Sequence, residues 1–211
     1  MKVKVCGITS YEDAAMVLDQ GVDALGFNFF PRSPRYLRPG DARSIIRRLP
    51  PFAAAVGLFV NVATAEEVSE LAAASGVQVV QLHGDETPEY CARLARWPLI
   101  KALRIGENGI PQDLESYPVQ AFLLDAKDDM IFGGTGKSFD WNLARGIEQM
   151  PPIILAGGLR PENVGEAIRM VRPYGVDVCS GVEFAPGRKD AQKLKQFMIE
   201  VRNVDHLFHR P

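Results

Sequence analysis

Eight short apolar runs recur along the chain, and each is followed by a longer stretch whose apolar residues have helical spacing. The runs cover residues 3–6, 24–29, 55–60, 77–82, 99–103, 121–125, 153–156 and 176–180. Near-continuous apolar strands are typical of parallel sheets that helices cover on both faces. Eight β-then-α units in 211 residues therefore predict an α/β protein with a closed (β/α)8 TIM barrel, in one domain spanning residues 1–211. An open, doubly wound sheet is the alternative, which the even spacing and the absence of a dinucleotide-binding fingerprint disfavour.

The segments between the runs carry ordinary helix signals. Ser10 and Thr64 are suited to cap the helices that follow them. Glycine and proline interrupt residues 107–117, so we expect a short or irregular helix there. Residues 203–211 are predicted to form a surface tail. The predicted helices cover residues 11–20, 65–75, 89–95, 162–171 and 191–201.

Composition excludes several classes of partner. The 24 basic and 26 acidic residues give a net charge of -2, so no overall field attracts nucleic acid or an anionic membrane. Three cysteines without a CxxC spacing argue against a disulfide framework or a structural zinc site. The chain shows no leader pattern and no apolar run long enough to span a membrane. We expect a soluble, cytoplasmic protein.

Candidate site residues are those that end an apolar run, because active sites of closed α/β barrels lie at the carboxyl ends of the strands. All eight runs contribute at least one polar residue or glycine at this position. The candidates are Cys6, Asn28, Asn61, Gln81, His83, Arg104, Asp125, Gly157-Gly158 and Ser180-Gly181.

Glycine-bearing segments follow the seventh and eighth runs, namely Ala156-Gly157-Gly158-Leu159 and Ser180-Gly181-Val182-Glu183. Loops after these two strands often bind phosphate through backbone N–H groups, which glycine lets a ligand approach closely. A short helix beyond Gly181 would add its dipole to such a site. Glycines that only make tight turns are the alternative, and two such segments on consecutive strands favour the phosphate site.

Cys6 and Asp125 are the candidates for proton transfer. A cysteine at a strand end is often a small buried hydrophobe, but a thiolate at the barrel mouth can act as a general base. Asp125 ends an apolar run, where an unpaired carboxylate would be costly to bury. It is either paired structurally or kept as a partly protonated acid. Asp128 and Asp129, in the polar loop that follows, are the nearest rivals for the acid role.

Two motifs are set aside. Residues 133–138 end like a phosphate-binding Walker A loop, but Ile131 stands where that motif requires its first glycine. The segment is therefore a glycine-rich loop after the sixth strand. His206 and His209 have an HxxH spacing without a third ligand, so we expect exposed side chains and no metal site.

Taken together, a set of segments in a fixed order resembles the phosphoribosylanthranilate isomerase family of tryptophan biosynthesis, over nearly the whole chain. Each segment alone is weak, and their order and spacing make the resemblance specific. The segments are Val5-Cys6-Gly7-Ile8-Thr9, Gly26-Phe27-Asn28-Phe29, Ser33-Pro34-Arg35-Tyr36, Val80-Gln81-Leu82-His83-Gly84, Leu124-Asp125, Gly133-Gly134-Thr135-Gly136, Leu155-Ala156-Gly157-Gly158-Leu159, Pro161-Glu162-Asn163-Val164, Ser180-Gly181-Val182-Glu183, Pro186-Gly187 and Lys189-Asp190.

The resemblance implies an Amadori rearrangement of a phosphorylated small molecule, N-(5-phosphoribosyl)anthranilate, without metal or cofactor. By this likeness Asp125 is the general acid that protonates the furanose oxygen, and Cys6 is the general base that removes the C2 proton. Arg35 is expected to meet the anthranilate carboxylate, as a bidentate arginine suits that anion. The phosphate is assigned to Gly158, Ser180 and Gly181. Further substrate-binding positions are Asn28, Gln81, His83, Gly134 and Gly136.

Two other classes stay open at this point. Pentose-phosphate epimerases use paired carboxylates and a metal, and the histidine-pathway isomerase has an aspartate where this chain has Cys6. A non-catalytic phosphate-binding barrel is the third possibility, which the presence of both Cys6 and Asp125 disfavours. Cys179 departs from the family pattern, which more commonly has a small polar residue there, and we expect it to pack in the core. The chain could be a monomer or a homodimer.

Overall fold

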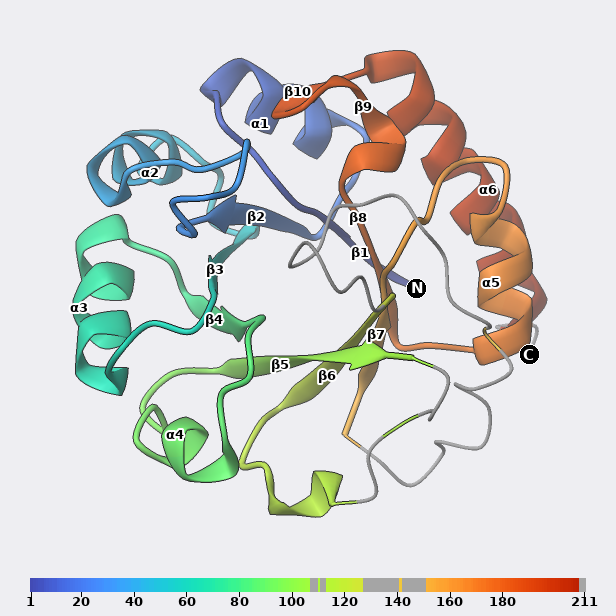
Figure 1. Ribbon diagram of the computed structural model, residues 1–211. Coiled ribbons are helices and arrows are strands. Elements are labelled where there is room, and N and C mark those ends of the chain that lie inside the picture. Colours follow the sequence, from blue (N-terminus) through green and yellow to red (C-terminus); the bar gives the residue numbers. More distant parts are fainter. Residues whose placement is uncertain (107–109, 111–112, 127–140, 142–150, 209–211) are drawn as a thin grey trace.

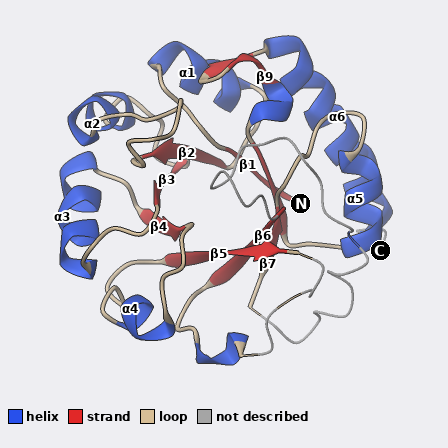
Figure 2. Cartoon of the chain, viewed as in Figure 1, coloured by secondary structure: helices blue, strands red, loops and turns tan. Residues whose placement is uncertain are grey.

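Eight parallel strands close into a barrel, with each strand hydrogen-bonded to its sequence neighbours and β1 paired with β8. The computed structural model describes residues 1–106, 110, 113–126, 141 and 151–208. The helices surround the ring of strands (Figure 1), and the colouring by secondary structure shows the same two layers (Figure 2). The closed barrel is thus confirmed, and the open-sheet alternative is wrong. The strands are β1 (Lys2–Val5), β2 (Ala24–Asn28), β3 (Ala54–Phe59), β4 (Val79–Leu82), β5 (Leu99–Ile105), β6 (Ala121–Ala126), β7 (Ile153–Leu155) and β8 (Gly175–Val178).

The closing seam between β1 and β8 positions part of the mouth. Lys4 is registered with Asp177, and Val5 with Val178. One residue further, the Cys6 backbone N–H donates to the Val178 carbonyl at 2.9 Å. The seam therefore brings the segment that follows β1 alongside the segment that follows β8.

The helices begin where the capping residues predict. The Ser10 side chain accepts a hydrogen bond from the Asp13 N–H, and the Thr64 side chain accepts one from the Glu67 N–H. In the described part of the interrupted segment, Leu114–Ser116 forms a 3-10 turn, which agrees with the expected short helix. A helix that the sequence pattern did not single out, α2, starts with proline in its first turn. The helices are α1 (Tyr11–Asp19), α2 (Pro39–Ile46), α3 (Ala65–Ser75), α4 (Pro88–Ala92), α5 (Val164–Val171) and α6 (Ala191–Phe208).

The C-terminal segment corrects one expectation. We expected a surface tail from residue 203, but α6 continues to Phe208. Val204 is fully buried against the core, and Asp205 accepts a hydrogen bond from the N-terminal ammonium at 2.7 Å. These two contacts hold the last turns of α6 against the barrel. The local sequence of residues 203–211 does not show them, because both partners are distant in the sequence.

Apolar packing forms two layers. The larger cluster lies between strands and helices, with Phe27, Phe59 and Phe197 fully buried in it. A smaller cluster that includes Val56 and Leu123 fills the barrel interior. No described helix combines the length and apolar character that crossing a bilayer demands.

Some sequence-predicted positions lie outside the described residues. They are Gly134, Gly136 and the rest of the 133–138 loop, the rival acids Asp128 and Asp129, and His209. His206 is described and is exposed, as expected.

Candidate active site

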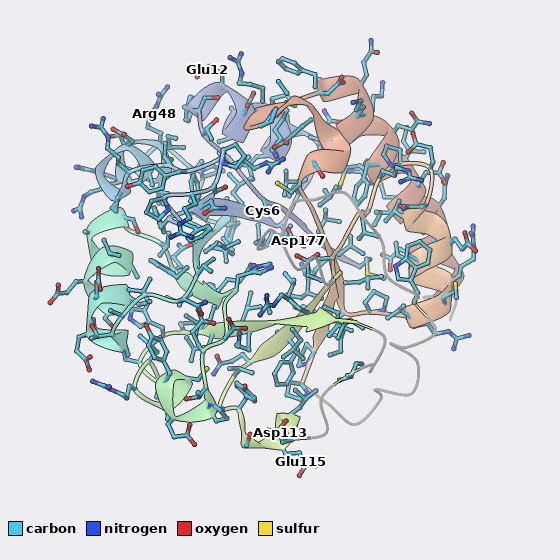
Figure 3. The ribbon with its side chains drawn as sticks, in the orientation of Figure 1. Cys6, Glu12, Arg48, Asp113, Glu115 and Asp177 are labelled. Carbon is cyan, nitrogen blue, oxygen red and sulfur yellow. The ribbon has the colours of Figure 1, made fainter. Side chains whose placement is uncertain are left out.

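A pocket lies at the carboxyl ends of the strands. Figure 3 shows Cys6 and Asp177 within the ring of strands, whereas Asp113 and Glu115 lie at the periphery. The pocket is lined by Cys6, Asn28, Phe30, Arg32, Ser33, Pro34, Arg35, Leu58, His83, Asp125, Ala156, Gly157, Gly158, Leu159, Asp177, Cys179 and Ser180. The sequence predicted nine catalytic or substrate-binding positions among the described residues, and seven of them line this pocket. The two that do not are Gln81 and Gly181.

Two candidates at strand ends lie elsewhere. Asn61 Nδ2 donates to Asp85, Asn61 Oδ1 accepts from the Asp85 N–H, and the Asn61 backbone N–H donates to Glu86. Arg104 is paired with Asp85. Both side chains therefore hold neighbouring loops together at the rim.

His83 joins Asp125 to Gln81. His83 Nε2 lies 3.0 Å from Asp125 Oδ2, and His83 Nδ1 lies 2.9 Å from Gln81 Nε2. An amide nitrogen can only donate, so Nδ1 accepts and Nε2 carries the proton toward Asp125. Gln81 is fully buried and does not line the pocket. Its position beneath His83 fixes the tautomer that faces the carboxylate.

Cys6 follows β1 and is buried among cationic groups. A hydrogen bond from the Cys179 thiol lowers the pKa of Cys6 well below the usual value for a thiol, against the opposing effect of burial. The positive charges of Lys4 and Lys189 lower it further. The site therefore favours the thiolate, the form that can accept a proton.

A buried ion pair lies beside Cys6. Lys4 Nζ donates to Asp177 Oδ2 at 2.9 Å, and Asp177 Oδ1 has no hydrogen-bond partner among the described residues. Burial raises the pKa of Asp177 to about 7. Burial opposes the charge of Lys4, but Asp177 and Cys6 together raise its pKa. Because two anionic neighbours support the lysine charge, we assign a protonated Lys4 and a carboxyl that ionises near neutrality.

Sequence reasoning did not single out this pair, although a signal was present. Lys4 stands two residues before Cys6, and Asp177 stands two residues before Cys179. Side chains two apart in a strand point to the same face. Each charged residue within an apolar run thus shares the face of a cysteine at the barrel mouth.

Arg35 is buried and engaged by a residue that the sequence did not select. Its Nε lies 3.0 Å and 3.1 Å from the two Glu183 carboxylate oxygens, and its Nη2 lies 2.7 Å from Oε2. Glu183 begins β9 (Glu183–Ala185), which pairs with β10 (Arg188–Lys189), and it also accepts from Lys189 Nζ at 2.7 Å. The Nη1 group of Arg35 makes no hydrogen bond to a described residue. It is the end of the guanidinium that can still meet an anion.

Asn28 shapes the loop that carries Arg35. Its Nδ2 donates to Ser33 Oγ at 3.0 Å, and its Oδ1 accepts from the Phe30 N–H at 2.8 Å. Ser33 Oγ in turn accepts from the Arg35 N–H at 3.1 Å. The polar atoms of Asn28 are thus used within this loop, at the edge of the pocket.

The two glycine segments lie against each other. Gly157 and Gly158 have φ values of 78° and 66°, in the left-handed region that favours glycine. A Cβ atom at Gly181 would collide with the carbonyl oxygen of Leu159. In place of the helix expected beyond Gly181, Ser180–Val182 forms a three-residue 3-10 turn. The pocket wall here is backbone, with Gly157, Gly158 and Ser180 facing it.

The described residues contain no group of three or more His, Cys, Asp or Glu side chains placed to hold a metal ion. The described pocket offers proton transfer, with a carboxyl that can give a proton and a thiolate that can accept one, beside a glycine-lined wall.

Comparisons with known proteins show the family to which this chain is similar. The family model described as N-(5'phosphoribosyl)anthranilate (PRA) isomerase matches residues 3–200. An N-(5'-phosphoribosyl)anthranilate isomerase from Pelobacter propionicus is 51% identical over 198 residues, which cover 94% of this chain and 94% of that protein. The relative from Trichlorobacter lovleyi is also 51% identical, over 97% of this chain and 99% of its own length.

Solved structures give the same result. The phosphoribosyl anthranilate isomerase from Thermus thermophilus has a TM-score of 0.89 at 40% identity, covering 97% of this chain and 100% of its own. A second isomerase, in complex with reduced 1-(o-carboxyphenylamino)-1-deoxyribulose 5-phosphate, has a TM-score of 0.83 at 39% identity, covering 96% of this chain and 99% of its own. The chain therefore belongs to the N-(5'-phosphoribosyl)anthranilate isomerase family.

Proposed function

We propose that Asp125 and Cys6 are the general acid and the general base with which this isomerase acts in tryptophan biosynthesis. The reaction is the Amadori rearrangement of N-(5-phosphoribosyl)anthranilate to 1-(o-carboxyphenylamino)-1-deoxyribulose 5-phosphate. One observation carries the assignment: a carboxyl on β6 and a thiol beyond β1 line the same pocket. An acid and a base that approach a furanose ring from different strands can act on different atoms of that ring.

The first step opens the ring. Asp125 gives its proton to the furanose oxygen, the bond from C1 to that oxygen breaks, and its electron pair stays on the oxygen. The anthranilate nitrogen pair forms the C=N bond of a protonated Schiff base. The carboxylate that Asp125 becomes accepts the hydrogen bond from His83 Nε2 at 3.0 Å, which stabilises the charge that develops.

The second step moves the proton from C2. The Cys6 thiolate takes it, the C–H electron pair forms the C1=C2 bond, and the C=N pair returns to nitrogen. The resulting enolamine tautomerises to the ketone, with a proton gained at C1 and lost from the C2 hydroxyl. The cations around Cys6 keep the thiolate available before this step.

Binding is assigned to the remaining parts of the pocket. Gly158, Ser180 and Gly181 hold the phosphate through backbone N–H groups, and Arg35 meets the anthranilate carboxylate with its Nη1 end. The enzyme takes a phosphorylated small molecule and needs neither nucleic acid nor membrane. We place it in the cytoplasm, as a monomer or a homodimer.

The decisive experiment is a fluorescence assay that follows the loss of phosphoribosylanthranilate generated in situ. The expected result is saturable turnover by the purified protein. Decay no faster than in buffer would exclude the function and leave a non-catalytic phosphate-binding barrel.

Gly181→Ala is expected to weaken phosphate binding. The added methyl group must displace the Leu159 carbonyl, so the two glycine segments move apart. We expect KM to rise by about tenfold or more while kcat changes by less than about threefold. Inhibition by inorganic phosphate should weaken in parallel. The matched control is Gly40→Ala in α2, where a methyl group meets no atom within 4 Å, and an equal effect there would contradict the assignment.

Arg35→Ala is expected to raise KM and to leave kcat nearly unchanged. A hydrogen bond to a charged group contributes about 1.5–3 kcal/mol, so KM should rise roughly 10- to 100-fold. Arg38→Ala is the control, because Arg38 belongs to the same segment but is exposed and paired with Asp41. Thermal unfolding separates the loss of the Glu183 pair from the loss of substrate contact. An unchanged KM would show that a residue other than Arg35 binds the anthranilate carboxylate.

A further inference from the structure

Glu183 holds one edge of the Arg35 guanidinium. Its two carboxylate oxygens accept from Arg35 Nε at 3.0 Å and 3.1 Å, and Oε2 also accepts from Nη2 at 2.7 Å. Both side chains are buried, with 10% of Arg35 and 4% of Glu183 exposed. A guanidinium is planar and presents its N–H groups in a fixed fork. Because Glu183 occupies the edge formed by Nε and Nη2, the end edge formed by Nη1 and the outer N–H of Nη2 is the one left for an anion.

Glu183 is itself fixed by other donors. Its Oε1 accepts from Lys189 Nζ at 2.7 Å and from the Gly187 N–H at 3.2 Å. The Cys179 sulfur lies 3.8 Å from the same oxygen, and Cys179 is half-buried and lines the pocket, which corrects its expected place in the core. The Lys189 side chain is fully buried and also donates to the Cys6 carbonyl at 2.6 Å. The carboxylate of Glu183 therefore has partners on both oxygens and is held in one orientation.

The charges of this cluster keep Glu183 ionised. Burial opposes the charged form, but the hydrogen bond from Arg35 and the charge of Lys189 lower the pKa of Glu183 below its usual value. One carboxylate then faces two cations, so these three groups together carry an excess of positive charge. A ligand carboxylate at the end edge of Arg35 would offset that excess, whereas a neutral group there would not.

Two further contacts fix the rest of Arg35. A Cβ atom at Gly7 would lie 2.5 Å from Arg35 Cδ, so the aliphatic part of the arginine side chain passes directly over the Gly7 backbone. The Arg35 backbone N–H donates to Ser33 Oγ at 3.1 Å. The backbone, the aliphatic part and one edge of the guanidinium are thus all held, and Arg35 is not free to follow an anion that is placed elsewhere in the pocket.

Glu183 also connects Arg35 to the segment assigned to the phosphate. It begins β9 and directly follows the turn Ser180–Val182, which contains Ser180 and Gly181. Gly181 is packed so closely that a Cβ atom there would collide with the Leu159 carbonyl. One short segment therefore carries the phosphate site and, three residues after Ser180, the carboxylate that holds Arg35. A ligand with both a phosphate and a carboxylate must match the fixed separation of these two sites.

We propose that Glu183 is a positioning residue that sets the specificity for the ring carboxylate of the substrate: it fixes the free end edge of Arg35 relative to the phosphate segment. The proposal rests on the proposed function, in which Arg35 meets the anthranilate carboxylate. A phosphorylated ligand without that carboxylate gains nothing from the fixed edge. Because Glu183 acts through Arg35 and touches no reacting atom, its loss should weaken binding and leave the proton transfers intact.

The test compares two ligands by isothermal titration calorimetry, in the wild type and in Glu183→Gln. One ligand is reduced 1-(o-carboxyphenylamino)-1-deoxyribulose 5-phosphate, and the other is the same molecule with hydrogen in place of the ring carboxylate. Glutamine keeps the size of the side chain, but its amide nitrogen cannot accept from Arg35. We expect the Kd of the first ligand to rise about tenfold and that of the second by less than about twofold. Equal weakening of both ligands would show a merely structural role and overturn the proposal.

Steady-state kinetics gives a second readout of the same variant. KM should rise about tenfold while kcat changes by less than about threefold, because Lys189 still donates to the Cys6 carbonyl. A loss confined to kcat would contradict a role in binding. The matched control is Glu66→Gln, which removes the same charge from an exposed ion pair with Arg93 and should leave KM and both Kd values unchanged.

Glu183→Asp keeps the proposal testable if the glutamine variant does not fold. Aspartate retains the charge that the two buried cations need, but its side chain is one methylene group shorter and cannot hold the guanidinium in the same place. It should weaken the ligand with the carboxylate and spare the ligand without it. A loss shared equally by both ligands would overturn the proposal here as well.

A double-mutant cycle separates the role of Glu183 from the proposed function. In Arg35→Ala protein, Glu183→Gln should change the Kd of the carboxylate ligand by less than about twofold, because Glu183 acts only through Arg35. Losses that multiply would overturn the proposal and leave the carboxylate contact of Arg35 in place. If Arg35→Ala alone weakens both ligands equally, the contact assigned in the proposed function is wrong, and the role of Glu183 falls with it. Selective binding by a protein that does not turn over the substrate would instead refute the proposed function alone.

Discussion

Asp125→Asn is expected to lower kcat by about 10²- to 10⁴-fold, the usual contribution of one proton-transfer group. The amide has the size of the carboxyl, and its oxygen can still accept the hydrogen bond from His83 Nε2. It cannot give a proton to the ring oxygen. Because the glycine segments and Arg35 are untouched, KM should change by less than about threefold. Steady-state kinetics in the in situ assay measures both constants.

The control for this variant is Asp113→Asn. Asp113 is exposed at the periphery of the barrel (Figure 3), so its loss should leave kcat at the wild-type level. Both proteins should unfold at the wild-type temperature. A kcat for Asp125→Asn within about tenfold of wild type would remove Asp125 from the acid role and return attention to Asp128 and Asp129.

The fold was predictable from the sequence because apolar runs and caps are local signals. Eight runs gave eight strands, and Ser10 and Thr64 cap α1 and α3. The errors fall where long-range contacts decide. α6 extends to Phe208 because Val204 reaches the core and Asp205 meets the N-terminus, 204 residues away in sequence.

The sequence predicted which residues lie at the strand ends, but not which of their side chains face the pocket. The rule that polar residues at strand ends face the pocket selected Cys6, His83 and Asp125, all of which line it. It also selected Asn61 and Arg104, which hold loops at the rim. Whether a strand-end side chain points inward or binds a neighbouring loop depends on partners such as Asp85, which come from a different loop.

Charge organisation explains why one thiol and not another can serve as the base. Cys91 on α4 is fully buried, and burial raises its pKa to about 11. Cys6 is nearly as buried, yet a hydrogen bond and the positive charges of Lys4 and Lys189 lower its pKa. Burial alone therefore keeps a cysteine thiol protonated, whereas burial among hydrogen-bond donors and cations favours the reactive thiolate.

The contrast between Cys6 and Cys91 leads to a second prediction of a large loss in kcat. Cys6→Ala should lower kcat by about 10²- to 10⁴-fold, because no group remains at that position to take the C2 proton. Cys91→Ala, which removes the buried thiol that stays neutral, should leave kcat unchanged. Substrate or product-analogue binding, measured by fluorescence quenching, should persist in Cys6→Ala.

The pH profile makes the same prediction in a form that folding defects cannot imitate. The pKa of Cys6 is lowered in the folded protein, so the thiolate fraction is lost only as the pH falls through that lowered value. The wild-type kcat/KM should therefore fall on the acid side as Cys6 gains a proton. In Cys6→Ala the residual rate should lose this acidic limb. A residual rate that retains the wild-type acidic limb would mean that another group is the base, since a removed thiol cannot titrate.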